Sequence, residues 1–391
     1  MRIAVSLLNF RPGRIGGTET YLRELIGHMA QTAGGDEIVL VVDREVAPQF
    51  RTAGVELAVI DVSARSVLCQ RWLEATSRYQ SRGISTFFEK LAPDAALFPQ
   101  QVVFPKRIAC PAVVVVHDLY HLELPENLSL LQRWYRKSIY HKSLEIADRI
   151  ITVSDYTKRC LIDQCALHER ASEVDTVHHG CRLPAPTSAV PACESAASPP
   201  FVYYPAISHP HKNHLQLFRT VARLRAAGRF PFRLLLSGEK TRYWAKLERE
   251  ILRLDLQHVV EHLGFLPFGQ VQSLFGRASA VVFPSIYEGF GIPVVEAAAL
   301  GKKLITSDLE VFRELGVPDK FRIDFNDPAE LHRALSIHSP TVLERPLQTW
   351  HETARQTLAI LRQAARNHSA LTAPVWAEPA CATHSSFARA A

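Results

Sequence analysis

Short apolar runs alternate with longer amphipathic stretches along most of this chain, and each pattern predicts one kind of element. The apolar runs of the first half predict strands at residues 2–8, 37–42, 55–62, 112–117 and 149–153. Helical periodicity lies between them, most clearly at 19–29 and 130–146. The alternation begins again after residue 200, with strands predicted at 201–204, 232–237, 259–264, 280–283 and 303–306. Such alternation favours parallel sheets that are covered by helices on both faces.

Two series of such elements, in a chain of 391 residues, predict two doubly wound α/β domains, because a single hydrophobic core rarely grows that large. Proline, serine and alanine without periodicity at 184–200 are typical of a linker. We therefore expect a first domain over 1–183 and a second over 201–345. A separate helix is expected at 346–366, and the Ala-, Ser-, Thr- and Pro-rich remainder, 367–391, is expected to be a disordered tail.

The composition narrows the class of protein without identifying it. Seven cysteines occur without a C-x-x-C pair, so neither a disulfide framework nor a zinc ribbon is indicated, and a reducing cytoplasm fits best. No apolar stretch approaches the roughly 20 residues that span a bilayer, and residues 1–11 are better explained as a core strand than as a signal peptide. The net charge of +6 is mild and no nucleic-acid-binding motif occurs, so we expect no nucleic acid partner.

The most informative segment is residues 283–296, Phe-Pro-Ser-Ile-Tyr-Glu-Gly-Phe-Gly-Ile-Pro-Val-Val-Glu. The apolar run that leads into it predicts a buried strand, the two glycines predict a turn, and the second proline predicts the start of a helix. Glu288 and Glu296 therefore lie on either side of a strand-to-helix junction. At the C-terminal edge of a parallel sheet, such carboxylates can grip ligand hydroxyls, while the helix N-terminus suits a phosphate. Taken alone, the same spacing also fits an ordinary helix start.

The string from Glu288 to Glu296 resembles the E-x7-E signature of family-4 glycosyltransferases, and the resemblance covers residues 1–365. It implies the GT-B fold, in which two Rossmann-like domains face each other across a cleft. It also implies retaining transfer of a hexose from a nucleotide diphosphate sugar, with no metal and no other cofactor. The histidines of the segment 209–214 lack the neighbouring carboxylate or cysteine that would complete a metal site.

The resemblance also implies roles for the residues of this junction. Glu296 is expected to bind the ribose hydroxyls, and to stay ionised because a carboxylate accepts paired hydrogen bonds from a diol. Glu288 is expected near the donor sugar, where it can support positive charge that develops at the anomeric carbon. Gly289, Phe290 and Gly291 are expected to bring main-chain N–H groups to the sugar hydroxyls.

Two short motifs of the first domain are expected to face this donor site. Gly16 and Gly17 follow the first strand and open a long helix, which suits a phosphate; a simple turn is the alternative. His117 ends a very apolar strand just before Asp118, and by resemblance its side chain contacts the donor sugar; a histidine satisfied within its loop is the alternative. Ser154 is predicted to cap the next helix and to shape the cleft.

Lys212 is the predicted cation for the donor diphosphate. By resemblance an arginine is expected five residues earlier, but this chain has Ile207, so the second phosphate cation is unassigned. Lys302 and Lys303 also stand where the family commonly has Thr-Pro. These departures leave open a catalytically inactive nucleotide-sugar-binding or scaffold protein. A sugar-nucleotide epimerase of the GT-B type is a further, less favoured alternative.

The acceptor is not defined by any motif. The segment 117–154 most resembles mannosyltransferase-type members, which favours GDP-mannose over a UDP-sugar, and a glycan or lipid-linked acceptor in the synthesis of a cell-surface polysaccharide such as lipopolysaccharide. The segment 133–137, Arg-Trp-Tyr-Arg-Lys, with Lys142 fits peripheral contact with the anionic inner face of the cytoplasmic membrane, and a solvated helix face fits it equally well. By resemblance, the helix that Trp350 opens crosses back to the first domain.

Overall fold

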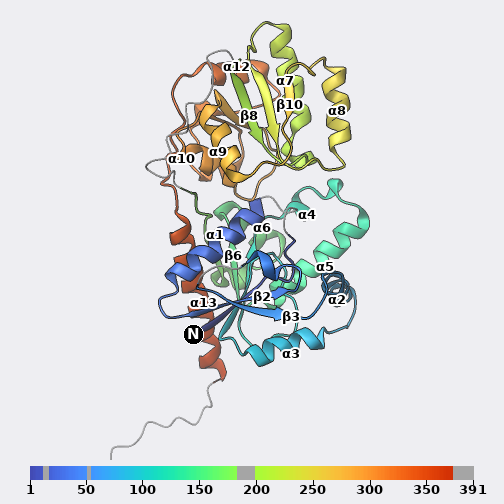
Figure 1. Cartoon of the computed structure of the whole chain (residues 1–391), viewed down its shortest axis with the longest axis vertical. Helices are drawn as coiled ribbons and strands as arrows, with labels where there is room; N and C mark the ends of the chain where they lie inside the picture. Colours follow the sequence, from blue (N-terminus) through green and yellow to red (C-terminus); the bar gives the residue numbers. More distant parts are fainter. Residues whose placement is uncertain (12–16, 51–53, 183–198, 373–391) are drawn as a thin grey trace, which may run out of the picture.

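The computed structural model describes residues 1–11, 17–50, 54–182 and 199–372, which form two α/β units stacked end to end (Figure 1). Each unit is built on one parallel sheet with helices packed against it. The predicted doubly wound α/β architecture is therefore confirmed. Residues 184–198 of the predicted linker and 373–391 of the predicted tail lie outside the described residues, as does residue 183.

The first unit contains a seven-stranded sheet in which all neighbouring strands are parallel. Its strands, in spatial order, are β3 (Glu56–Ile60), β2 (Glu37–Asp43), β1 (Arg2–Ser6), β4 (Ala95–Phe98), β5 (Ala112–Val116), β6 (Arg149–Thr152) and β7 (Val174–Thr176). Every residue of β5 is buried, because helices cover both faces of the sheet. This double coverage explains why the sequence shows continuous apolar runs instead of strict alternation.

Six α-helices and three short 3₁₀ turns accompany this sheet in the described part of the chain. They are α1 (Gly17–Thr32), η1 (Ala47–Gln49), α2 (Ala64–Thr76), α3 (Arg82–Leu91), α4 (Tyr120–Glu123), η2 (Pro125–Asn127), α5 (Leu130–Ile146), α6 (Asp155–Gln164) and η3 (His168–Glu173). The start of α6 was predicted from Ser154, and this prediction is confirmed, because the Ser154 Oγ accepts the main-chain N–H of Thr157 at 3.0 Å.

The second unit contains a six-stranded parallel sheet. Its strands, in spatial order, are β10 (Val260–His262), β9 (Arg233–Ser237), β8 (Phe201–Pro205), β11 (Ala280–Phe283), β12 (Leu304–Ser307) and β13 (Arg322–Ile323). The helical elements around it are η4 (Pro210–Lys212), α7 (His214–Ala226), α8 (Trp244–Arg253), α9 (Phe268–Arg277), α10 (Ile292–Ala299), α11 (Glu310–Glu314), η5 (Asp319–Phe321) and α12 (Pro328–Ser336).

The two sheets share one topology. In the first sheet the strand order reverses between β1 and β4, and in the second it reverses between β8 and β11. At such a reversal the connections leave in opposite directions, so a crevice opens beyond the C-terminal ends of the strands. The loops that follow these strands are therefore the ones that the fold places against a ligand.

Three strands were missing from the sequence prediction, namely β4, β7 and β13. Two alanines open β4, and alanine favours helices over strands. The other two strands are too short for a period-2 pattern, since β7 has three residues and β13 has two. Both are edge strands, and they form because a neighbouring strand offers hydrogen bonds that the local sequence does not reveal.

The last helix, α13 (Trp350–Thr372), follows the second sheet in sequence but packs on α1, β4 and β5 of the first unit (Figure 1). Its buried side includes Leu358, Leu361 and Ala364. The helix had been predicted at 346–366. Residues 367–372, which were assigned to a disordered tail, are helical, because the helix continues beyond its buried stripe.

The chain crosses between the units at two neighbouring segments. An isolated parallel bridge joins Cys181 to Thr349, and the Cys181 N–H donates to the Gln348 carbonyl at 2.9 Å. The approach is so close that a Cβ on Gly180 would lie 2.3 Å from the main-chain nitrogen of Trp350. Glycine is therefore needed at position 180, and these paired segments form the natural hinge between the units.

Candidate active site

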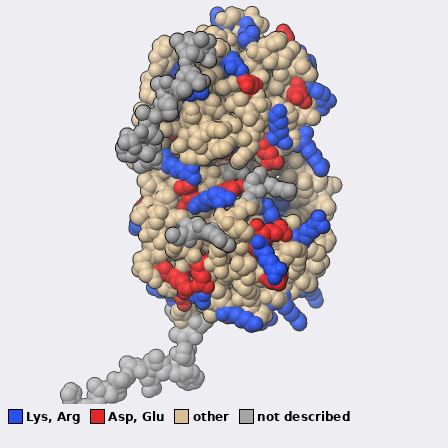
Figure 2. All heavy atoms as spheres, in the orientation of Figure 1, with Lys and Arg blue, Asp and Glu red and all other residues tan. Residues whose placement is uncertain are grey.

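A cleft of about 560 Å³ lies between the C-terminal edges of the two sheets. The residues singled out from sequence that line it are Gly17, His117, Lys212, Glu288, Gly289, Phe290, Gly291 and Glu296. Gly16 lies outside the described residues, although Gly17 opens α1 at the edge of the cleft. The fold thus brings residues from Gly17 to Glu296, which lie far apart in sequence, to one cavity. On the face shown in Figure 2, charged side chains of both signs lie along the waist between the units.

Glycine is required twice in the junction between β11 and α10. Gly291 is the N-cap residue of α10 with φ of 103°, a left-handed conformation that side chains disfavour. A Cβ on Gly289 would lie 1.8 Å from the main-chain oxygen of His117 in the opposite domain. The Gly-Phe-Gly turn therefore serves two purposes, since one glycine starts the helix and the other lets the two domains touch.

Glu288 and Lys212 form an ion pair across the second-domain side of the cleft. The Lys212 Nζ lies 2.6 Å from the Glu288 Oε1, and the Ser285 hydroxyl donates to the same oxygen at 2.7 Å. Lys212 ends the short turn η4, and Asn213, in a left-handed conformation with φ of 57°, fixes that turn by donating from Nδ2 to the Pro284 carbonyl. Two loops from different strands thereby hold an ammonium and a carboxylate in direct contact.

Glu296 is the most unusual group in the cleft. It lies one turn into α10, its side chain is 8% exposed, and its Oε1 accepts no hydrogen bond from the described residues. Burial raises its pKa from 4.5 to about 7, although Arg182 opposes the shift and Glu24 adds to it. Burial therefore works against the ionised form of Glu296 that was expected from the sequence. A buried acceptor without a donor is costly, and ligand hydroxyls would satisfy it.

Rings form the centre of the first-domain side of the cleft, and the charged residues Glu19, Arg23, Asp118 and Arg182 line it as well. The His117 ring packs edge-on against Tyr21 at 4.8 Å and lies 5.6 Å from the His179 ring. Its Nε2 is 2.8 Å from the Pro99 carbonyl, which fixes the ring orientation. Burial lowers the pKa of His117 and holds that of His179 well below its ordinary value, so both rings are neutral at physiological pH.

Asp118 does not bond the His117 ring. Its Oδ1 accepts the Tyr120 N–H at 3.0 Å, although the residue lines the cleft. The His117 ring is satisfied by the Pro99 carbonyl and packs on two aromatic neighbours, which fits the alternative of a satisfied histidine, and the residue also lines the cleft.

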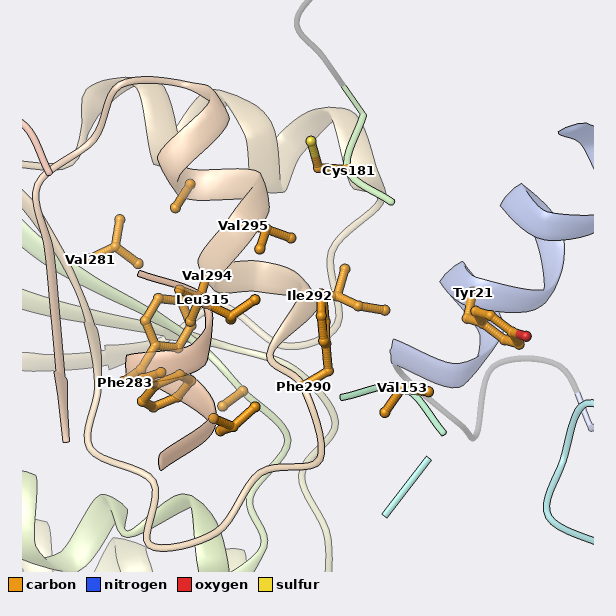
Figure 3. Close-up of a cluster of buried hydrophobic side chains, with 14 of the residues drawn as sticks. Tyr21, Val153, Cys181, Val281, Phe283, Phe290, Ile292, Val294, Val295 and Leu315 are labelled. Atoms are coloured by element: carbon orange, nitrogen blue, oxygen red, sulfur yellow. The ribbon is translucent and has the colours of Figure 1, made fainter. Parts of the chain in front are cut away.

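Apolar contacts continue from one domain to the other beside the polar site. Figure 3 shows Phe290 and Ile292 on the side of α10 that faces Tyr21 of α1 and Val153, and all of these residues belong to one buried cluster. Phe290 also packs edge-on against His179 at 4.9 Å. The two domains are therefore in contact in this structure, and the cleft is in a closed arrangement.

Ile207, at the position where the resemblance implies an arginine, lines the cleft with an apolar side chain. Lys302 and Lys303 do not take its place. Their Nζ atoms bond the carbonyls of Gly276 and Leu335 at 2.8 and 2.6 Å, and neither residue lines the cleft. The Lys302-Lys303 departure therefore lies outside the cleft.

Sequence reasoning missed many of the residues that line the cleft, among them Arg182, His179 and Phe265. Arg182 bonds Glu24 and lies over the Phe268 ring at 3.8 Å, so one guanidinium links the two domains. His179 has an Nδ1 with no partner among the described residues. Phe265, 69% exposed, offers an aromatic face at the rim. An exposed aromatic in a glycine- and proline-bounded loop was a readable signal, whereas Arg182 and His179 depend on the hinge geometry.

Asp155, His178 and Glu314 place possible metal-ligating atoms within 4.8 Å of one another. However, both carboxylate oxygens of Glu314 already accept main-chain N–H groups, from Asp155 and Tyr156, each at 2.8 Å. The His178 Nε2 lies 2.7 Å from the Glu314 Oε1. This donor set is that of a hydrogen-bond network between the domains, and it needs no cation to satisfy it.

Comparison with solved structures defines the fold. Sucrose-phosphate synthase from Thermosynechococcus elongatus has a TM-score of 0.67 at 16% identity, with 95% of this chain and 98% of that chain covered. WaaG, a glycosyltransferase involved in lipopolysaccharide biosynthesis, has a TM-score of 0.60 at 14% identity, with 95% and 100% covered. This likeness establishes the GT-B fold.

Two family models then identify the family. The model of glycosyltransferase family 4 matches residues 15–183, and the model of glycosyl transferases group 1 matches residues 193–338. Each corresponds to one of the two α/β units, and together they cover most of the chain. The chain belongs to the family-4 glycosyltransferases, as the E-x7-E string had indicated.

Curated relatives include mannosyltransferases, and this chain spans about half the length of the two described here. The O-antigen chain mannosyltransferase B of Escherichia coli is 28% identical over 214 residues, which are 52% of this chain and 55% of the relative. The O-antigen chain mannosyltransferase RfbU of Salmonella typhimurium is 26% identical over 204 residues, with 52% and 53% covered.

Proposed function

We propose that this protein is a retaining mannosyltransferase that moves mannose from GDP-mannose to a glycan or lipid-linked acceptor in the synthesis of a cell-surface polysaccharide. The observation that carries the proposal is Glu296, a buried carboxylate that faces the cleft with one oxygen unpartnered. A ribose diol is the ligand that such a group accepts best, because two adjacent hydroxyls can donate to one carboxylate. The mannosyltransferase relatives support the choice of sugar and acceptor class.

The donor half of the reaction falls to the second domain. Lys212 would neutralise the leaving diphosphate, and the N-terminus of α10 beside Gly291 would add main-chain N–H groups. The donor must then displace Lys212 from Glu288, to which it is bonded at 2.6 Å. Glu288, freed of that cation, would lie beside the sugar and stabilise charge at the anomeric carbon.

We infer a mechanism without a resident metal or other cofactor, because the residues that face the donor already include a cation and a helix N-terminus. His117 is neutral, so it would hydrogen-bond the sugar instead of attracting its phosphates. The loop that carries Ile207 and Lys212 supplies one cation to the diphosphate in this scheme, because Ile207 stands where the arginine is expected. Arg23 and Arg182 are the other cations that line the cleft among the described residues, and Arg182 lies beside Glu296.

A lipid-linked acceptor implies that the enzyme works at the cytoplasmic face of a membrane, and one surface suits that location. Leu130, Leu131 and Trp134 on the first turns of α5 are 80, 64 and 51% exposed, and Trp72 of the adjoining α2 is 46% exposed. Lys137 on the same helix face is exposed as well. Apolar side chains beside a cation favour the interface of an anionic bilayer.

The membrane surface differs in one respect from the sequence expectation. The Lys142 Nζ bonds the carbonyls of Glu74 and Ala75 at 3.2 and 2.7 Å, so it holds α2 and does not face a membrane. No described helix is both long and apolar enough to cross a bilayer. The fraction of protein that sediments with phosphatidylglycerol vesicles should therefore be lower for the double variant Trp134→Ala, Leu130→Ala than for the wild type. Equal sedimentation of the two proteins would contradict the proposed membrane contact.

Turnover of a panel of GDP- and UDP-sugars by the wild type and by Glu296→Ala tests the proposed activity. We expect release of GDP from GDP-mannose by the wild type and a loss of about hundredfold or more in the variant, because the ribose loses its acceptor. Equal turnover by both proteins would show that the site is wrongly assigned. Nucleotide binding without turnover of any donor would instead favour the inactive binding protein, and conversion of the sugar nucleotide without transfer would favour an epimerase.

A further inference from the structure

The loop that carries Glu288 is held by the first domain at consecutive points. The Tyr287 hydroxyl accepts the Leu119 N–H at 2.5 Å, and the carbonyl of Gly289 accepts hydroxyl hydrogen bonds from Ser154 at 2.7 Å and Thr157 at 3.2 Å. Ser154 and Thr157 are both buried, at 0 and 1% exposed. The peptide between the predicted sugar-facing residues Glu288 and Phe290 is thus fixed by hydroxyls of the opposite domain.

The same helix start receives a carboxylate from the second domain. Glu314 of α11 accepts the first two free N–H groups of α6, at Asp155 and Tyr156, while Ser154 accepts the third, at Thr157. These donors have no partner within the helix, so an anion is favoured there. Burial alone would raise the pKa of Glu314, but hydrogen bonds from His178 and the two N–H groups hold it below its ordinary value. The carboxylate is therefore ionised where it meets the helix.

We propose that the first turn of α6 is a latch that sets the geometry of the donor-sugar loop when the domains close. This inference rests on the proposed function, since it concerns how the same cleft is organised. Ser154 and Thr157 hold the loop, and Glu314 holds the helix that carries them. All three are positioning residues, because they act on Glu288 and Phe290 through the Gly289 peptide.

Opening the cleft breaks every one of these bonds at once. The Gly289 carbonyl then loses both hydroxyl donors, and its peptide is free to rotate with the flanking residues. A donor that binds to the correctly oriented loop therefore favours the closed form, and closure favours donor binding by the same factor, as linkage requires. Gly289 must lack a side chain for this, since the latch brings it against the His117 main chain.

The latch is tested by the paired substitution Ser154→Ala with Thr157→Val, and independently by Glu314→Ala, which leaves the first domain intact. Small-angle X-ray scattering of the ligand-free proteins and of their complexes with GDP should show a larger radius of gyration for both variants than for the wild type. The kcat/KM for GDP-mannose should fall about tenfold to a hundredfold, because two buried hydrogen bonds that order the loop are lost.

Ser143→Ala is the matched control. Ser143 is 1% exposed and its Oγ accepts the Val103 N–H at 3.0 Å, so it loses a comparable buried bond, but within one domain. We expect its scattering and kcat/KM to match the wild type even if its melting temperature falls. Equal melting temperatures for Ser143→Ala and the Ser154 variant, with a larger radius only in the latter, would separate a latch from a loss of stability.

Two results would overturn the inference. One is a radius of gyration and a kcat/KM for both latch variants that match those of the wild type. The other is a lower kcat/KM with no change in the ligand-free or GDP-bound radius. Failure of the wild type to bind either GDP or UDP would refute the proposed function itself, whereas the ligand-free scattering would still report whether Ser154, Thr157 and Glu314 hold the domains together.

Discussion

The two walls of the cleft are built from different chemistry. The second-domain wall presents ionisable groups whose partners are few or exchangeable: Lys212 and Glu288 bond each other, and Glu296 has an unpartnered oxygen. At its centre the first-domain wall presents neutral rings, His117 and His179, held by packing and by one carbonyl. Both walls stand at the same topological position, the strand-order reversal of a doubly wound sheet.

This difference indicates a division of labour on one repeated scaffold. An ion pair that a ligand can separate and a carboxylate with one unpartnered oxygen are suited to an anionic, hydroxyl-rich ligand, because the ligand supplies new partners to both. Neutral rings that are already packed are suited to shaping the space and excluding water. If this account is right, damage to the contact between the walls should cost most, damage to the charged wall should follow, and damage to the neutral wall should cost least.

The largest effect is expected when the walls are forced apart. Gly289→Ala would place a methyl group 1.8 Å from the His117 carbonyl oxygen, so the domains cannot meet in the arrangement seen here. We expect roughly a thousandfold loss of kcat/KM with GDP-mannose, because both the positioning of the donor and the contacts of one wall are lost. Gly269→Ala, where the added methyl meets open space, should leave kcat/KM unchanged. An active Gly289→Ala enzyme would show that turnover does not need this closure.

Removal of the cation from the charged wall should cost about a hundredfold in kcat. Lys212→Ala deletes the ammonium that faces the diphosphate and leaves Glu288 with only the Ser285 hydroxyl as partner. Steady-state kinetics with GDP-mannose measure the loss, and Lys246→Ala, an exposed lysine on α8, is the matched control. A change in KM alone, with kcat intact, would mean that Lys212 binds the donor without stabilising the departing diphosphate.

Neutralising the unpartnered carboxylate should stabilise the ligand-free protein at high pH. Burial raises the pKa of Glu296 from 4.5 to about 7, so the folded state holds its proton more tightly than the unfolded state. Stability is therefore full below about pH 4.5 and falls as the pH rises to about 7, by on the order of 3 kcal/mol. Glu296→Gln should accordingly raise the melting temperature at pH 8 much more than at pH 5.

The stability effect has its own control and its own contradiction. Glu248→Gln, an exposed residue of α8, should change the melting temperature equally little at both pH values. If Glu296→Gln shifted the melting temperature equally at pH 5 and pH 8, the ionised carboxylate of Glu296 would not destabilise the protein. The inference that Glu296 lacks a hydrogen-bond donor that a ligand hydroxyl supplies would then be contradicted.

The smallest effect is expected on the neutral wall. His117→Gln keeps a neutral hydrogen-bonding side chain that can reach the Pro99 carbonyl, so we expect about a tenfold loss of kcat/KM. Since burial lowers the pKa of His117, the rate should show no titration of this residue above pH 7. A pH profile that His117→Gln flattens near neutrality would mean that a charged histidine takes part, and the contrast between the walls would be wrong.

The sequence predicted the elements that carry their own pattern. Continuous apolar runs such as Ala112–Val116 marked buried parallel strands, and the string around Gly289 and Gly291 marked a junction that only two glycines could make. Strands without such a pattern, β4, β7 and β13, were missed because partner strands define them. The C-terminal end of α13 was also missed, because residues 367–372 contain no glycine or proline that would end the helical pattern there.

Site features that depend on distance through space were out of reach of the sequence. Lys212 and Glu288 were chosen separately, and nothing in their spacing shows that they bond each other at 2.6 Å. Burial of Glu296, which raises its pKa to about 7, depends on tertiary packing that its place in the sequence does not reveal. Arg182 and His179 enter the cleft because a bridge at Cys181 pairs the two hinge segments. Motifs therefore located the groups, while the tertiary structure set their charge states.

The central claim is that the cleft binds the nucleotide part of a sugar donor through Glu296. Calorimetric titration of GDP into the wild type and into Glu296→Ala at pH 8 tests it without any knowledge of the acceptor. The account predicts that GDP binds the wild type and that the variant binds it about a hundredfold or more weakly, because the ribose hydroxyls lose a charged acceptor. Equal affinity of the two proteins for GDP would contradict the account.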